Sequence, residues 1–364
     1  MMAKKPQILL VIRSISGRGG ERSVLTLAQG FYEMGCEVHL LCFNATQDYD
    51  LDPHFNYHLF DINHWYYKFF ITSTWKYQAI AKKLDEYVLS HIGQPDLVLS
   101  NLIQSNRILS NSHLKNIAYV IRNTFSKENQ KALKTHPNKV LKRYKNIYKK
   151  HPCICVSQGV EHDLRQTLGD IGEVTTIYNA FDQAYMQLQA QAYQPDFEDY
   201  IIHIGAFCYA KAHDVLLKAY AQSSQQYPLL LLGKGELEAE IRQLIVQLDL
   251  EKNVHILGFN KNPYPYIKHA KALILSSRYE GFVRVVPEAI ALGTSVISTD
   301  CPSGPNEVLS EKNLVAVDDV DALAEKMTAV MNTPENFSTG FDPAFLPKNI
   351  AKQYLDYFHI HSYC

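Results

Sequence analysis

Short apolar runs alternate with amphipathic helical patterns along this chain, and the alternation starts twice. The first series starts with apolar runs at 7–13 and 37–43, on either side of a glycine loop at 17–20 and a helical pattern at 22–34. Later runs lie at 97–100, 117–121 and 152–156, and a second series occupies 200–204, 228–232, 254–257, 271–275, 295–298 and 314–316. Apolar strands alternating with helices are typical of parallel sheets covered on both faces. The sequence therefore predicts an α/β protein with two Rossmann-like, doubly wound domains.

The second series contains two glutamates eight positions apart, Glu280 and Glu288, within SSRYEGFVRVVPEAIALGTSVISTDCPSGPNE (276–307). Glu280 belongs to a glycine turn after an apolar run, and we expect Glu288 about two turns into the helix that follows. In such a unit the helix N-terminus faces the crevice above the strands and favours an anion such as a diphosphate. Glu280 would reach the hydroxyls of a sugar and Glu288 those of a ribose. The stretch therefore predicts a nucleotide-sugar site.

This stretch resembles the E-x7-E signature of the retaining nucleotide-sugar glycosyltransferases of family four, which have the two-domain GT-B fold. Seven other segments resemble the same family in order and spacing. They are SGRGGERSVLTLAQGF (16–31), CVSQGVEHDL (155–164), IYNAFD (177–182), IGAFCYAKAHDVLLKAY (204–220), LLLLGKGELEAEI (229–241), VHILGF (254–259) and VAVDDVDALAEKM (315–327). The resemblance thus covers most of the chain.

The resemblance implies that two Rossmann-like domains face each other across a cleft. We expect an acceptor-binding domain at 1–183 and a donor-binding domain at 184–345, with a C-terminal helix in 346–364 that rejoins the first domain. The polar, glutamine-rich segment 183–199 is read as the connection between them.

The family's donor site maps onto residues of this chain one by one. Lys211 and Glu280 take the catalytic positions, Lys211 as the cation that holds the leaving diphosphate. The donor-binding residues implied by the resemblance are Gly19, Gly20, Gly205, Lys211, Phe259, Glu280, Gly281, Phe282, Val283, Arg284 and Glu288. The family has an arginine where this chain has Ala206, so one of two cations is missing, and Arg284 is a candidate substitute. Lysine suits phosphate as a point charge but lacks the planar fork of arginine.

A second departure lies at 118–126, AYVIRNTFS, where many relatives have a histidine near the transferred sugar. Here Arg122 or Asn123 is the candidate contact to the sugar or the acceptor, with a structural loop as the alternative. We identify no covalent nucleophile. The resemblance implies retention by attack of the acceptor hydroxyl on the face from which the phosphate leaves.

No metal or other cofactor is expected. Asp48, Asp50 and Asp52 imitate a metal-binding DxD motif, but they precede Pro53 in what reads as a solvated loop. Asp318, Asp319 and Asp321 read as caps of the following helix. The net charge of −1 gives no general attraction to nucleic acid. The seven scattered cysteines, without a CxxC pair, fit a reducing cytoplasm. The N-terminal apolar run is too short for a signal peptide, and no apolar segment approaches ~18 residues.

Two segments of the first domain favour contact with a membrane. Residues 64–83 interleave aromatic side chains with lysines, and residues 127–150 hold nine basic residues with Glu128 as their one acid. Such segments suit an anionic lipid surface, although a core helix with a solvated basic face is the alternative. We expect a UDP-sugar donor and a saccharide or lipid-linked acceptor in surface polysaccharide, lipopolysaccharide or lipid-linked oligosaccharide synthesis. The alternatives are a nucleotide-sugar epimerase, an NAD-dependent dehydrogenase, which lacks its glycine fingerprint, and a donor-binding pseudoenzyme.

Overall fold

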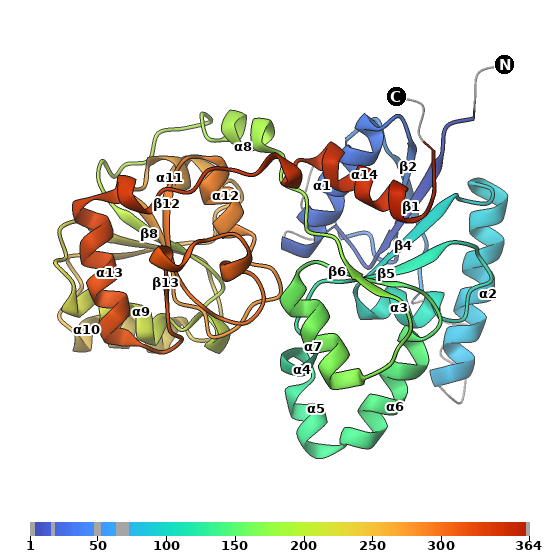
Figure 1. Ribbon diagram of the computed structural model, residues 1–364, viewed down its shortest axis with the longest axis horizontal. Coiled ribbons are helices and arrows are strands. Elements are labelled where there is room, and N and C mark those ends of the chain that lie inside the picture. Colours follow the sequence, from blue (N-terminus) through green and yellow to red (C-terminus); the bar gives the residue numbers. More distant parts are fainter. Residues whose placement is uncertain (1–3, 16–18, 47–51, 63–72, 362–364) are drawn as a thin grey trace. The chain divides into compact units, whose positions relative to one another are not determined.

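The computed structural model describes residues 4–15, 19–46, 52–62 and 73–361. The chain forms two compact units, an N-terminal unit of residues 1–181 and 343–364 and a C-terminal unit of residues 182–342. Each unit is built around one parallel sheet with helices on both of its faces (Figure 1). The prediction of two Rossmann-like α/β domains is confirmed.

The N-terminal unit contains a seven-stranded parallel sheet in the order β3-β2-β1-β4-β5-β6-β7. Its strands are β1 (Gln7–Ile12), β2 (Glu37–Cys42), β3 (Asn56–Leu59), β4 (Leu97–Asn101), β5 (Ile117–Ile121), β6 (Cys153–Cys155) and β7 (Val174–Thr176). Its helices are α1 (Gly19–Glu33), α2 (Ser73–His91), α3 (Leu102–Leu109), α4 (Phe125–Glu128), α5 (Gln130–Thr135), α6 (Pro137–Tyr148), α7 (Gln158–Leu168) and α14 (Pro347–Tyr357). Strand order reverses between β1 and β4, so the loops after these two strands meet at a topological switch point.

The chain returns to this unit at its end. The Phe181 N–H donates to the Phe345 carbonyl over 2.8 Å, and α14 then lies along α1 (Figure 1). Gly30 of α1 permits this contact, because a Cβ there would lie 2.1 Å from the Pro347 carbonyl oxygen. The rings of Phe31 and Tyr354 then pack edge to face, with centroids 6.0 Å apart.

The C-terminal unit contains a six-stranded parallel sheet in the order β10-β9-β8-β11-β12-β13. Its strands are β8 (Ile201–Ile204), β9 (Leu229–Leu232), β10 (Val254–Gly258), β11 (Ala272–Leu275), β12 (Ser295–Thr299) and β13 (Leu314–Val315). Its α-helices are α8 (Gln183–Gln189), α9 (His213–Gln222), α10 (Glu238–Gln247), α11 (Tyr264–His269), α12 (Val285–Ala291) and α13 (Val320–Asn332). Its 3-10 turns are η2 (Tyr209–Lys211), η3 (Pro305–Glu307), η4 (Glu311–Asn313) and η5 (Pro334–Phe337), and η6 (Pro343–Phe345) leads into α14. Strand order reverses between β8 and β11, which brings the loops after these strands together.

Several local predictions differ from the structure. The segment read as a connection begins with helix α8, which is capped by Asp182 and packs against α11 and α12 of the C-terminal unit. The glycines Gly19 and Gly20 form the first turn of α1 instead of preceding it. Packing of α8 against the C-terminal unit buries Met186. No helix in the described ranges combines the length and hydrophobicity that a membrane crossing requires.

Candidate functional site

The switch point of the C-terminal unit joins Lys211 and Glu280, which are 69 positions apart in the sequence. Lys211 ends the turn η2 after β8, and Glu280 lies in the loop after β11. The Lys211 Nζ donates to Glu280 Oε1 over 2.5 Å, and the two side chains are only 18% and 12% exposed. The two residues that the sequence assigns to catalysis therefore form one partly buried ion pair.

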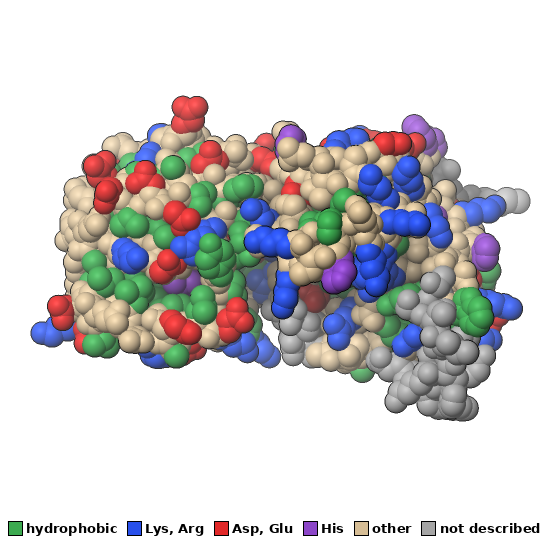
Figure 2. All heavy atoms as spheres, turned by 90° about the horizontal axis from the view of Figure 1, so that it is seen from below, with side chains coloured by type: hydrophobic (Ala, Val, Ile, Leu, Met, Phe, Trp, Pro, Cys, Tyr) green, Lys and Arg blue, Asp and Glu red, His purple; other side chains and the backbone are tan. Residues whose placement is uncertain are grey.

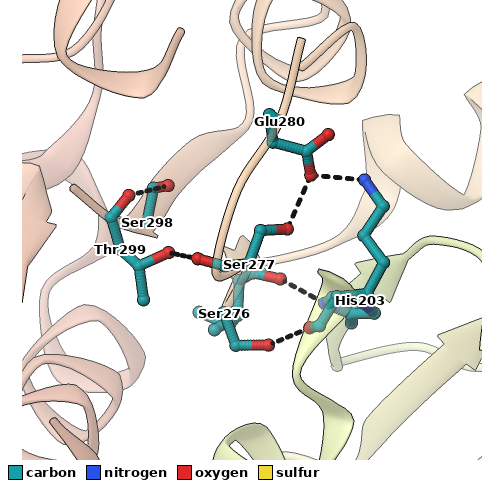
Figure 3. A network of polar contacts seen from close by, with 8 residues as sticks. His203, Ser276, Ser277, Glu280, Ser298 and Thr299 are labelled. Atoms are coloured by element: carbon teal, nitrogen blue, oxygen red, sulfur yellow. Dashed lines mark hydrogen bonds and ion pairs between the residues drawn. The ribbon is translucent and has the colours of Figure 1, made fainter. Parts of the chain in front are cut away.

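Hydroxyl groups hold this pair in place (Figure 3). Ser277 Oγ donates to the same Glu280 Oε1 over 2.6 Å, and Thr299 Oγ1 of β12 donates to the Ser277 carbonyl over 2.6 Å. On the lysine side, Ser276 Oγ donates to the Lys211 carbonyl over 2.8 Å. Three consecutive strand ends thus fix the carboxylate and the ammonium group. These hydroxyl groups were not predicted from the sequence. The signal for two of them was present, because Ser276 and Ser277 directly follow a buried strand.

Gly205 lies directly beneath Lys211. A Cβ at this position would stand 3.1 Å from Lys211 Cδ and 3.2 Å from His203 Nε2, closer than ordinary packing allows. Any side chain here would push the lysine stem away from Glu280. Ala206, in contrast, is exposed, so the position where the family has an arginine offers space for a longer side chain.

Glu288 also lies beside this loop, but not at the predicted depth in its helix. Because α12 begins at Val285, Glu288 lies in the first turn and not about two turns in. Arg284 Nε and one terminal nitrogen donate to Glu288 Oε1 over 3.2 and 3.1 Å, and both side chains are largely buried. Gly281, Phe282 and Val283 form the backbone between the two glutamates.

Phe259 follows β10 and exposes 51% of its surface. The Lys234 ammonium group, which follows β9, lies 5.1 Å from the centroid of the Phe259 ring. An aromatic face with an adjacent cation suits a flat or anionic group at the carboxyl ends of these strands. Phe259 was predicted from the sequence as part of the site, whereas Lys234 was not.

Two neutral histidines pack behind Lys211. His203 Nδ1 contacts the Ile274 carbonyl oxygen at 2.9 Å, and its ring meets the His213 ring edge to face. Burial, with a smaller contribution from the nearby Lys211 charge, lowers the pKa of His213 to about 4. The pKa of His203 is also well below its usual value, chiefly because the ring is fully buried.

The stability of the protein should therefore decrease as pH falls below about 6.5, where free histidine takes up a proton. The unfolded chain binds protons between pH 6.5 and 4 that folded His213 does not, so acid favours unfolding. For His213 the loss is on the order of 3 kcal/mol by pH 4. Urea unfolding at pH 7.5, 6, 5 and 4 measures this loss. His213→Phe and His213→Gln should both flatten this pH dependence, and an unchanged slope in both variants would contradict the assignment.

In the N-terminal unit, Arg122 follows β5 near the start of α1. Its Nε and one terminal nitrogen donate to Asn101 Oδ1 over 3.2 and 2.8 Å, and its other terminal nitrogen donates to Asn179 Oδ1 over 2.7 Å. A Cβ on Gly20 would lie 3.8 Å from Arg122 Cδ. The structure therefore brings Gly20 and Arg122 together, with Gly19 beside Gly20 at the start of α1, whereas Asn123 is exposed and hydrogen-bonds to Glu128. Asn101 and Asn179 were missed, although Asn101 ends a buried strand, which is a visible signal.

The roles predicted for the aspartates of the DxD-like run and of residues 318–321 are partly confirmed. Asp319 caps α13 by accepting from the Ala322 N–H over 3.0 Å, as predicted. The capping prediction for Asp318 is wrong, because its carboxylate accepts from Arg278 instead. Residues 48–51 of the DxD-like run lie outside the described residues. Within the described ranges, no three His, Cys, Asp or Glu side chains gather closely enough to hold a metal ion.

Comparison with known proteins gives two family matches. The model described as Glycosyltransferase Family 4 matches residues 17–185, and the one described as Glycosyl transferases group 1 matches residues 187–339. An uncharacterized glycosyltransferase of Methanocaldococcus jannaschii is 40% identical over 111 residues, which are 30% of this chain and 27% of that protein.

A second relative is a 4-alpha-N-acetylgalactosaminyltransferase of Campylobacter jejuni, named as acting on N-acetylgalactosamine-N,N'-diacetylbacillosaminyl-diphospho-undecaprenol. It is 31% identical over 158 residues, 43% of each chain. The chain thus spans less than half the length of the curated relatives that it matches.

The structure of Anabaena HepE, solved in complex with UDP and glucose, has the same fold. It superposes with a TM-score of 0.77 at 18% identity, over 97% of this chain and 99% of HepE. Since the two family models together account for nearly all of residues 17–339 and this fold extends over almost the whole chain, the protein belongs to the group 1, family four glycosyltransferases and has their GT-B fold.

Proposed function

We propose that the protein is a retaining glycosyltransferase that moves a hexose or N-acetylhexosamine from a UDP-sugar to a saccharide acceptor. The main support for this proposal is the Lys211–Glu280 pair at the switch point, in which the ammonium and carboxylate groups lie 2.5 Å apart. Glu288 lies in the helix that follows. A cation for phosphate and carboxylates for hydroxyl groups are what a nucleotide-sugar needs. HepE, solved with UDP and glucose, supports UDP as the carrier.

The proposed step needs no covalent enzyme intermediate. The acceptor oxygen forms a bond to the anomeric carbon while the bond from that carbon to the diphosphate oxygen breaks. The bonding electrons leave with UDP, and the acceptor proton passes to the departing phosphate oxygen. Lys211 stabilises the charge that develops on that oxygen, and Glu280 orients the sugar. Glu288 binds the ribose, and Phe259 with Lys234 lies against the base.

We propose that the diphosphate is held without a metal ion, because the Lys211 ammonium group supplies positive charge beside it. Transfer should then persist in EDTA. We also place Arg122 at the acceptor or the transferred sugar, since its guanidinium group is held rigidly by Asn101 and Asn179.

The donor assignment is tested with the purified full-length protein and a panel of UDP-glucose, UDP-galactose, UDP-N-acetylglucosamine and UDP-N-acetylgalactosamine. At least one should raise the melting temperature and release UDP slowly by hydrolysis. Stabilisation without UDP release would indicate a donor-binding pseudoenzyme, for which the missing arginine at Ala206 would be the reason. If no UDP-sugar stabilises the protein and none is hydrolysed, a UDP-sugar donor is rejected. A panel of GDP-sugars and ADP-sugars would then follow.

We further propose that the acceptor is lipid-linked and that the protein works on the inner face of the cytoplasmic membrane. The Campylobacter relative's named acceptor is a diphospho-undecaprenol saccharide. Helix α6 has one apolar face that is buried and one basic face that is exposed, the latter with Lys139, Lys142 and Arg143. Figure 2 shows this side of the N-terminal unit, where Lys and Arg side chains gather and acidic ones are few. Residues 64–72 of the aromatic segment lie outside the described residues, but Trp75 of α2 is 58% exposed.

Liposome flotation should show binding to anionic vesicles that weakens with salt, and none to neutral vesicles. Each basic residue near such a surface contributes up to ~1 kcal/mol. Replacing Lys139, Lys142 and Arg143 by Glu should abolish flotation without changing UDP affinity. The matched control replaces three exposed lysines of the C-terminal unit, Lys218, Lys252 and Lys268, by Glu, and should still float. If the wild type ignores anionic vesicles, the membrane proposal is wrong.

A further inference from the structure

Arg278 lies in the loop that carries Glu280, and all three nitrogens of its guanidinium group donate hydrogen bonds. Nε donates to Asp318 Oδ1 over 2.7 Å, and the two terminal nitrogens donate to Asp214 Oδ2 over 2.8 Å and to the Tyr209 carbonyl over 3.1 Å. The arginine is only 13% exposed, whereas the two carboxylates are about half exposed. One cation thus connects the segment before α13, the start of α9 and the turn η2.

The same loop is bonded along its length to the turn that carries Lys211. The Arg278 N–H donates to the Ala210 carbonyl over 2.7 Å, and Ser276 Oγ donates to the Lys211 carbonyl over 2.8 Å. With the Arg278 side chain on the Tyr209 carbonyl, three successive carbonyls of η2 accept from this loop. The Tyr209 ring covers the guanidinium group at 4.4 Å. Moving Arg278 would therefore shift η2 relative to the loop.

We infer that Arg278 is a positioning residue for sugar transfer, which sets the distance between the Lys211 ammonium and the Glu280 carboxylate by clamping their two loops together. This inference rests on the proposed function of that pair. Arg278 itself is directed to Asp214, Asp318 and Tyr209, so it acts through Lys211 and Glu280. Sequence reasoning gave it no role, because its partners lie about 40 to 70 positions away.

We call Arg278 with its three partners, Asp214, Asp318 and the Tyr209 carbonyl, the clamp. Its geometry requires arginine. Three acceptors in three directions match the planar fork of a guanidinium group, and the single ammonium of a lysine cannot reach all of them. Although partial burial raises the pKa of Asp214, the hydrogen bond and the charge of Arg278 outweigh it and leave that pKa below its usual value. The clamp is therefore charged at neutral pH and at mildly acidic pH.

The test measures hydrolysis of the best UDP-sugar of the panel, together with UDP binding by calorimetry. Arg278→Met should lower kcat at least about tenfold, since displacements near 1 Å cost up to ~10²-fold in rate. Its UDP affinity should fall by less than its kcat, because the contacts proposed for Glu288 and Phe259 with the ribose and the base do not depend on Arg278, whereas Lys211 also contacts the diphosphate. Arg278→Lys should recover part of the lost rate. Arg242→Met, which removes an exposed arginine paired with Glu238 on α10, is the matched control and should have no effect.

A double-mutant cycle separates positioning from general structural support. If Arg278 acts through Lys211, Arg278→Met should cost little further rate in a Lys211→Ala background. Additive losses would reject the inference. If Arg278→Met does not fold, Asp318→Asn replaces it: Asp318 has a φ of +62°, a backbone that asparagine tolerates, and loss of the charge should give a smaller decrease in kcat. Wild-type rates in Asp318→Asn and Arg278→Lys together would also overturn the inference.

The experiments distinguish failure of the proposed function from failure of the Arg278 inference. A wild-type protein that neither binds UDP nor hydrolyses any UDP-sugar would reject the donor assignment before Arg278 is tested. An active wild type with a fully active Arg278→Met variant would reject only the clamp.

Discussion

Lys211→Ala is expected to reduce sugar transfer by about 10²- to 10³-fold, the loss typical for removal of one group that stabilises developing negative charge. The effect should be large because this chain has Ala206 where its family has a second cation. Lys211 is then the one cation of the family's pair that this chain retains. UDP release from the UDP-sugar, measured at saturating donor, gives the rate.

Two variants sharpen this result. Lys218→Ala removes an exposed lysine on α9 and serves as the control, with an unchanged rate expected. Ala206→Arg adds the family's arginine at an exposed position and should leave UDP affinity intact or increase it. A near wild-type rate in Lys211→Ala would show that the cation has been assigned to the wrong residue.

Replacement of the two glutamates should separate binding from transfer. Glu288→Ala should weaken UDP itself by about 10- to 10²-fold, because a lost hydrogen bond with a charged partner costs ~1.5–3 kcal/mol. Glu280→Ala should leave UDP affinity nearly unchanged but reduce transfer by about 10²-fold, since a misplaced sugar loses its reactive orientation. Calorimetry with UDP and initial rates of UDP release provide the two measurements.

The control for this pair is Glu288→Gln, which keeps the side-chain volume and an acceptor for Arg284. It should lose less UDP affinity than Glu288→Ala. Equal losses of UDP affinity in Glu280→Ala and Glu288→Ala would contradict the division of roles. Such a result would mean that the Lys211–Glu280 pair contributes to nucleotide binding as a unit.

The outline of the fold was predictable because it depends on local pattern. Strands such as Leu229–Leu232 are buried on both faces and read as continuous apolar runs, whereas the helices between them alternate apolar and polar positions. The glycine-containing loops after β8 and β11 were likewise visible. The errors lie at the ends of elements: α12 begins closer to Glu288 than expected, and α8 forms where a connection was predicted. Both depend on packing against neighbours distant in sequence, which periodicity does not report.

The sequence by itself determined the residue types of the site and their order, because a motif records which side chains are present. Only the tertiary structure decided their partners. In the structure Lys211 pairs with Glu280, and Arg284 pairs with Glu288. Asp318 pairs with Arg278 instead of capping a helix. The physical reason is that hydrogen bonds and ion pairs fall off within a few ångströms, and the distances between loops are set by strand order. In this protein, strand order places the ends of β8 and β11 side by side although Ile204 and Leu275 are 71 positions apart.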